Sequence, residues 1–154
     1  MLSKKDILII TQLRRNARET LTKISKKTSM PISTIYDKLR YYQNSIITKH
    51  TALIDFSKLG FNARANIMIK VDRSIRDEIR KFLLKHQNIN SLYKISNGFD
   101  FLIEGVFKNV KDVEDFLDAL SEKFKLEQTN VYYIVEDIKK EGFMNDERLL
   151  NIIL

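Results

Sequence analysis

The sequence predicts an α+β fold, in which a helical, basic N-terminal third precedes a larger region of mixed strands and helices. Residues 1–50 contain 11 Lys and Arg against three acidic residues, a charge of +8, whereas residues 51–154 contain 16 against 17, a charge of −1. The spacing of apolar residues also changes, from helical in the first part to a period of two after Gly60. A charge excess confined to one third of a chain is typical of a part that meets a polyanion.

The first two predicted helices begin at residues that suit the N-cap position. Ser3 is followed three residues later by Asp6, a capping-box spacing, and the second helix starts near Thr20. At helical spacing, the residues expected to face inward are Ile7, Ile10, Leu13, Ala17, Leu21, Ile24 and Thr28.

A tight turn separates the second helix from a third. Pro31 disfavours helix at Met30, and Ser33 is expected to cap a helix that runs to about Gln43. Its buried stripe is predicted to consist of Ile35, Leu39 and Tyr42. Two short helices joined by a turn predict a helix-turn-helix.

The third helix carries the groups that a recognition helix needs on the side opposite its buried stripe. Arginine reads guanine, hydroxyls contact bases or phosphates, and lysines on the preceding helix contact phosphates. The predicted DNA-binding residues are Lys23, Lys26, Lys27, Ser33, Thr34, Tyr36, Asp37, Lys38, Arg40, Tyr41 and Lys49. The alternative interpretation is a solvated polar face, but the preceding turn and the charge of +8 favour DNA.

Asp37 is unusual on such a face because phosphate repels a carboxylate. It could accept a hydrogen bond from the amino group of cytosine. A pair with Arg40 or Tyr41, three and four residues later, is the favoured expectation.

The rest of the chain predicts a link and a second domain. Residues 46–54 are expected to be extended, and a strand at 63–71, a helix at 75–83, strands at 92–96 and 99–107, a helix at 110–124 and a strand at 131–135 follow. The order is βαββαβ. We therefore expect an N-terminal (winged) helix-turn-helix at residues 1–46, a link at 47–60, a ferredoxin-like domain at 61–139 and a tail at 140–154.

Apolar groups on both faces of the predicted strands indicate association between copies. Leu102, Val106, Tyr132 and Ile134 would need cover on the face without helices, and a homodimer is the simplest way to provide it. The apolar tail is expected to dock on the same chain or on a partner.

The sequence gives little support for an enzyme, and we expect neither catalytic residues nor a metal or cofactor. It has no cysteine, no Gly-rich phosphate motif and only two histidines, His50 in the link and His86 at a helix end. The acidic residues at 112–118 suit a helix start rather than a metal. No apolar run is long enough to span a membrane and no signal peptide is evident, so a cytoplasmic protein is expected.

Three local patterns resemble the Lrp/AsnC (leucine-responsive regulatory protein/asparagine synthesis) family of transcriptional regulators. Residues 2–10, Leu-Ser-Lys-Lys-Asp-Ile-Leu-Ile-Ile, are similar to the family's opening Leu-Asp-x-x-Asp-x-x-Ile-Leu. Asn-Ala-Arg at 16–18 matches the same triplet, and Asn-Gly-Phe-Asp-Phe at 97–101 is similar to the Gly-Tyr-Asp-Tyr loop. The resemblance spans residues 2 to about 139.

This resemblance implies double-stranded DNA as a partner, self-association into dimers and further into tetramers or octamers, and a small amino-acid effector. The effector would bind near Gly98, Asp100 and Thr129. The chain departs from the family at Ser29, where the turn usually has Gly, and at residues 129–131, where Thr-Asn-Val replaces Thr-x-Thr. The glycine that usually follows the recognition helix is absent, and Asp-Lys at 37–38 replaces Arg-Arg.

The sequence thus predicts a sequence-specific DNA-binding transcriptional regulator that acts as a homodimer or higher oligomer, with a possible amino-acid-like effector. Two alternatives stay open. One is an architectural protein with little sequence preference, and the other is an enzyme on the same scaffold, such as a tetrapyrrole decarboxylase.

Overall fold

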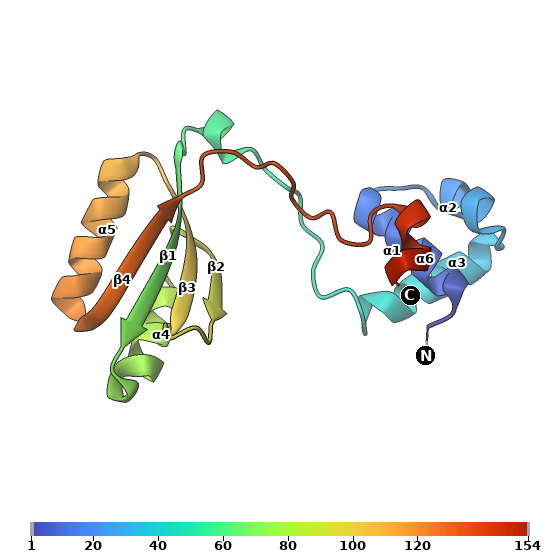
Figure 1. Cartoon of the computed structure of the whole chain (residues 1–154). Helices are drawn as coiled ribbons and strands as arrows, with labels where there is room; N and C mark the ends of the chain where they lie inside the picture. Colours follow the sequence, from blue (N-terminus) through green and yellow to red (C-terminus); the bar gives the residue numbers. More distant parts are fainter. Residues whose placement is uncertain (1, 154) are drawn as a thin grey trace. The chain divides into compact units, whose positions relative to one another are not determined.

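The computed structural model describes residues 2–153 and divides into two compact units. One unit combines the chain up to Leu53 with the segment from Ile138 onward, and the other spans Ile54–Asp137 (Figure 1). The N-terminal unit is therefore discontinuous in sequence. The C-terminal tail, expected to dock on the same chain or on a partner, lies in the same unit as the first three helices.

The first part of the N-terminal unit contains three helices: α1 (Lys4–Arg15), α2 (Leu21–Thr28) and α3 (Ile32–Gln43). The predicted caps of the first two are confirmed. Ser3 and Asp6 form a reciprocal capping box, and the Thr20 hydroxyl accepts a hydrogen bond from the backbone N–H of Lys23. These contacts satisfy N–H groups that have no partner within the helix.

The start of α3 differs from the expectation. The helix begins at Ile32 with Pro31 in the N-cap position, so Ser33 lies in the first turn and does not cap it. Proline can occupy this place because its fixed φ suits a helix start and its missing N–H would have no partner there. The turn before it places Ser29 in the left-handed conformation, with φ of +53°.

A small core joins the three helices. Ile9, Ile24, Met30, Ile35 and Tyr42 are buried, with partly buried apolar neighbours around them. The stripe predicted for α3 is confirmed, but the one for α1 is only partly correct. On α1 it is Ile9 that is fully buried, whereas Ala17 lies beyond the end of the helix and is exposed.

The second unit is a four-stranded antiparallel sheet with two helices. The strands are β1 (Ala63–Val71), β2 (Ile89–Lys94), β3 (Phe101–Phe107) and β4 (Leu126–Tyr133), in the order β2-β3-β1-β4. The helices are α4 (Arg76–Leu84) and α5 (Val110–Lys123). The predicted ferredoxin-like order is confirmed. Four short helices complete the described chain: η1 (Phe56–Leu59), η2 (Arg73–Ile75), η3 (Glu147–Leu149) and α6 (Leu150–Ile153), which follows η3 directly.

Several predicted boundaries were wrong. Strand β2 starts three residues before the expected Leu92, and β4 starts five residues before the expected Val131. The first half of β4 lies at an exposed edge of the sheet and is polar. It therefore lacks the alternation of apolar residues from which a strand is predicted. Between α3 and β1 no strand forms within the described residues, so the segment expected to be extended at 46–54, or to supply a wing, has no sheet partner.

Side chains on one face of the sheet build the larger core. Alternate residues of β1, from Ala63 to Val71, are buried together with Ile79 and Leu83 of α4 and with Val113, Phe116 and Leu120 of α5.

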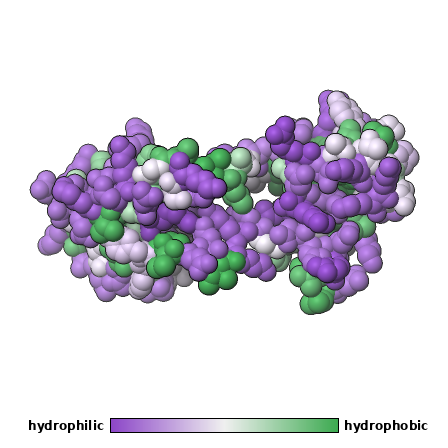
Figure 2. Space-filling model, turned by 90° about the horizontal axis from the view of Figure 1, so that it is seen from above, coloured by the Kyte–Doolittle hydropathy of each residue, from purple (hydrophilic) through white to green (hydrophobic). Residues whose placement is uncertain are grey.

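The opposite face of the sheet carries apolar groups that the helices do not cover. Met68, Leu102 and Val106 are half-buried there, and Tyr93 and Tyr132 are exposed. The surface seen in Figure 2 is mostly hydrophilic and is interrupted by hydrophobic patches.

Candidate nucleic-acid interface and effector site

Helix α3 exposes one polar and aromatic face. Ser33, Tyr36, Asp37, Arg40 and Tyr41 are all exposed, and the two tyrosine side chains remain 53% and 64% accessible. Ser33, Asp37 and Arg40 are separated by four and three residues, which places them on one side of the helix. The predicted recognition residues are thus brought together, apart from two that turn toward α1.

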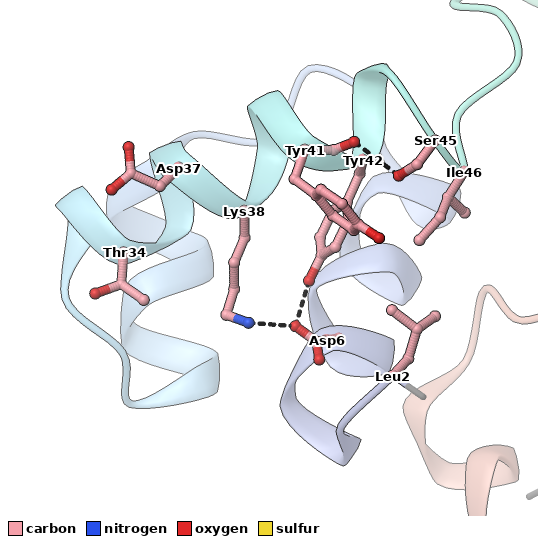
Figure 3. A pocket seen from close by; sticks show the side chains of 9 residues that line it. All are labelled: Leu2, Asp6, Thr34, Asp37, Lys38, Tyr41, Tyr42, Ser45 and Ile46. Atoms are coloured by element: carbon pink, nitrogen blue, oxygen red, sulfur yellow. Dashed lines mark hydrogen bonds and ion pairs between the residues drawn. The ribbon is translucent and has the colours of Figure 1, made fainter.

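Those two residues, Thr34 and Lys38, are half-buried and line an open groove of about 810 Å³. The groove lies between the N-terminus of α1 and helix α3 (Figure 3). Its lining consists of Leu2, Asp6, Thr34, Asp37, Lys38, Tyr41, Tyr42, Ser45 and Ile46. The groove therefore borders the exposed face of α3.

The Asp6 carboxylate is the centre of a hydrogen-bond network beneath this groove. One oxygen accepts from Lys38 Nζ and from the Tyr42 hydroxyl, each at 2.5 Å, and the other accepts from the backbone N–H and the hydroxyl of Ser3 at 2.7 and 2.6 Å. The Lys38 bond, followed by those from Ser3 and Tyr42, holds the pKa of Asp6 far below its usual range. Burial, and then the bond to Asp6, raises the pKa of Tyr42.

This network gives Lys38 a role that the sequence did not predict. Its ammonium group is bound to Asp6, 32 residues earlier, and so ties α3 to α1. Sequence reasoning treated Asp6 only as a capping residue, because nothing local identifies partners so distant in the chain.

The pairing expected for Asp37 does not occur. Within residues 2–153, no hydrogen bond or ion pair joins Asp37 to Arg40 or Tyr41, and all three side chains are exposed. An exposed pair of this kind gains little because water screens it. Asp37 is therefore presented to solvent beside Arg40.

The basic residues of α2 and the link differ in their contacts. Lys23 Nζ lies 3.5 Å from Glu19, and Lys27 donates to Gln12 on α1 at 2.7 Å. Lys26 and Lys49 are exposed, and neither side chain has a hydrogen bond or ion pair within the described part of the chain.

The predicted effector residues gather at one end of the sheet. Gly98 has a φ of +90°, which an L side chain rarely adopts, and it sits in the turn before Asp100. The backbone N–H of Asp100 donates to Ile69 of β1 at 2.8 Å, and Thr129 of β4 pairs with Ile69 from the other side.

The Asp100 carboxylate is itself engaged. It accepts from the backbone N–H of Val71 at 2.8 Å, and its other oxygen lies 2.8 Å from Arg76 Nε, whose N–H is not aligned for a hydrogen bond. Asp100 thereby fastens the loop to the end of β1. Arg76, which sequence reasoning missed, places a cationic group beside this loop.

The other polar clusters show structural roles. His86 packs against Phe116 and Phe82, and burial lowers its pKa. Asn109, just before the acidic start of α5, caps that helix by accepting from Asp112 N–H. Residues 2–153 contain no group of three or more His, Cys, Asp or Glu that could hold a metal ion.

None of the helices described is long and apolar enough to cross a membrane.

Comparisons with known proteins agree with this architecture. The HTH-type transcriptional regulator FL11 of Pyrococcus horikoshii is 29% identical over 140 residues, which cover 90% of this chain and 93% of that protein. Solved structures that share the fold include two transcriptional regulators of bacteria. The transcriptional regulator NMB0573 of Neisseria meningitidis, in its L-Met complex, has a TM-score of 0.84 at 19% identity and covers 91% of this chain and 94% of its own. LrpC of B. subtilis has a TM-score of 0.81 at 20% identity and covers 91% and 99%.

Residues 64–143 match the Lrp/AsnC ligand binding domain. This match spans more than half of the chain and includes all of the sheet except Ala63, both of its helices and the Gly98 loop. The chain therefore belongs to the Lrp/AsnC family of transcriptional regulators.

Proposed function

We propose that this protein is a homodimeric, sequence-specific DNA-binding regulator of transcription that inserts α3 into the major groove. The observation that carries the proposal is the exposed face of α3 in a unit with a charge of +8. Residues 1–53 supply that charge, and the segment from 138 onward, with three basic and three acidic residues, leaves it unchanged. A helix-turn-helix with this charge can approach a polyanion and present side chains to base edges.

The side chains divide into two groups by what they can contact. Arg40 has the planar fork that reads guanine, and Asp37 beside it can accept from a cytosine amino group. Ser33, Tyr36 and Tyr41 offer hydroxyls at the edges of the same face. These residues would supply sequence preference.

Phosphate contacts would come from the neighbouring lysines. Lys23, Lys26 and Lys27 lie on α2, and Lys49 follows α3. Lys38 is bound to Asp6, so its principal role in this proposal is to position α3, with Thr34 beside it in the groove.

The sheet unit would supply self-association and effector binding. Its uncovered face, which includes Met68, Leu102 and Val106, suits a second copy. Two such dimers would form a tetramer and four would form an octamer. The L-Met complex of NMB0573 supports an amino-acid-like effector. In this chain Gly98, Asp100 and Thr129 would form that site. Arg76, which lies beside Asp100, would supply a positive charge for the carboxylate of the effector.

A selection of bound duplexes from a random pool, run at two salt concentrations, tests the proposal. A regulator enriches one motif with two-fold symmetry at both concentrations. Enrichment of no motif, with affinity that depends only on salt, would instead indicate the architectural alternative.

A single substitution then tests the recognition face. Arg40→Ala should weaken binding to the selected motif by about tenfold or more while random duplex is affected much less. Arg80→Ala, an exposed arginine on α4, is the matched control and should change neither. Equal weakening on both duplexes would show that Arg40 contacts phosphate and not bases.

A further inference from the structure

The C-terminal segment is fastened to helix α1 by one arginine. Arg14 donates from Nη1 and Nη2 to the Glu141 carboxylate at 3.1 Å each. It also donates from Nη2 to the Glu141 carbonyl at 3.3 Å and from Nε to the Phe143 carbonyl at 3.1 Å. Because one planar guanidinium group donates to a carboxylate oxygen and to two backbone carbonyls, it fixes both the position and the direction of the chain.

The backbone conformation of Glu141 indicates that its surroundings hold it in place. Glu141 has a φ of +52° although it is not glycine, a conformation that costs about 1 kcal/mol and persists where the surroundings impose it. Beyond it, Leu150 is 3% exposed, so the anchored segment also contributes a buried side chain to this unit.

The same segment reaches the DNA-binding helices through Gln12. This residue is buried, donates to Glu147 at 3.4 Å and accepts from Lys27 Nζ at 2.7 Å. The tail is thus connected to a lysine that the proposed function assigns to phosphate contacts.

The other end of the segment is fastened within the sheet unit. Just after β4, the backbone N–H of Ile134 donates to the carbonyl of Arg64, and the Arg64 guanidinium donates to the Asp137 carboxylate at 2.6 and 3.1 Å. Only residues 138–140 separate this anchor from the one at Glu141. The chain therefore passes between its two units twice, at 53–54 and at 137–138, and the second passage is held by an arginine on either side.

We infer that Arg14 and Glu141 are positioning residues that make the C-terminal segment a second tether on the DNA-binding unit. This inference rests on the proposed function, because a second tether would matter for a dimer that binds two half-sites of DNA. A second tether limits the range over which each helix-turn-helix can move, and so raises the effective concentration of the second one once the first is bound.

The test compares Arg14→Gln with Arg15→Gln. Both remove one positive charge from the last turn of α1, but Arg15 makes none of the hydrogen bonds to the tail described above. Its charge acts on the tail only as the smallest of the influences that lower the pKa of Asp146. Each variant is measured, in the full chain, on the selected symmetric site and on a single half-site.

Both variants should weaken half-site binding to the same small extent. Arg14→Gln alone should lower the ratio of symmetric-site to half-site affinity, on the order of tenfold. An unchanged ratio in Arg14→Gln would overturn the inference.

A second measurement does not require DNA. Because the chain has no cysteine, Thr22→Cys and Glu122→Cys allow a spin label in each unit, with labelled protein diluted in excess unlabelled protein. Adding Arg14→Gln should broaden the distance distribution, and adding Arg15→Gln should not. If the wild type bound no duplex, the proposed function would fail, and the distance distribution would still decide whether the tether exists.

Discussion

Replacing Asp6 with asparagine should destabilise the N-terminal unit by about 3 kcal/mol. The carboxylate accepts four hydrogen bonds, from Ser3 twice and from Lys38 and Tyr42. An asparagine has one acceptor oxygen, so its amide group would face donors. Hydrogen bonds to a charged group are each worth about 1.5–3 kcal/mol, and water in the adjacent groove screens part of that energy.

The assay is amide hydrogen exchange of α1, α2 and α3, with α4 and α5 as an internal reference. A loss of about 3 kcal/mol corresponds to exchange faster by roughly a hundredfold in the first three helices. Asp72→Asn, an exposed cap in the sheet unit, controls for loss of a carboxylate and should leave those helices unchanged.

A double-mutant cycle and a pH titration can refute the reasoning. Lys38→Met should cost much less in the Asp6→Asn background than in the wild type, since its partner is already gone. Because the folded pKa of Asp6 is depressed, its contribution is complete above the unfolded value of about 3.9 and is lost as pH falls below it. Equal costs of Lys38→Met in both backgrounds, or the same loss in acid for wild type and Asp6→Asn, would show that the network does not hold α3 to α1.

Three further predictions concern other parts of the chain. Ser29→Gly should stabilise the N-terminal unit by about 0.5–1 kcal/mol, because Ser29 has a φ of +53°, and an unchanged unfolding midpoint in urea would contradict this. Changing Lys26 and Lys27 to Gln together should reduce the slope of log affinity against log salt by about 0.9 for each lost phosphate contact, measured by titration of duplex at several salt concentrations. Asp100→Asn should destabilise the sheet unit by about 1.5 kcal/mol without any ligand present, since Val71 N–H loses a charged acceptor. An unchanged thermal unfolding temperature would show that Asp100 does not stabilise the sheet unit.

The parts of the fold that sequence predicted are those encoded by neighbouring residues. Ser3 and Thr20 were identifiable as caps because their partners lie three residues away. Strand β1 was identifiable because one face is buried and the other is not, which produces a strict alternation.

The parts that sequence missed depend on distant residues or on exposure. The first half of β4 is an exposed edge, where polar residues carry no periodic signal. The partner of Asp6 is 32 residues away and that of Arg14 is 127 residues away, and no local pattern specifies such pairs. The candidate recognition face was predictable as a group, but the diversion of Lys38 from that face was not.

The discontinuity of the N-terminal unit has a consequence for synthesis on the ribosome. Helices α1–α3 emerge first, yet the guanidinium group of Arg14 and the side-chain N–H group of Gln12 bind acceptors in residues 141–147. At about 5–20 residues per second, the roughly 100 residues between the end of α3 and Glu141 require on the order of 5–20 s. The sheet unit, which is continuous, can therefore complete its fold before the DNA-binding unit does. A nascent chain would gain its full ability to hold DNA only after residues 141–147 have left the ribosome.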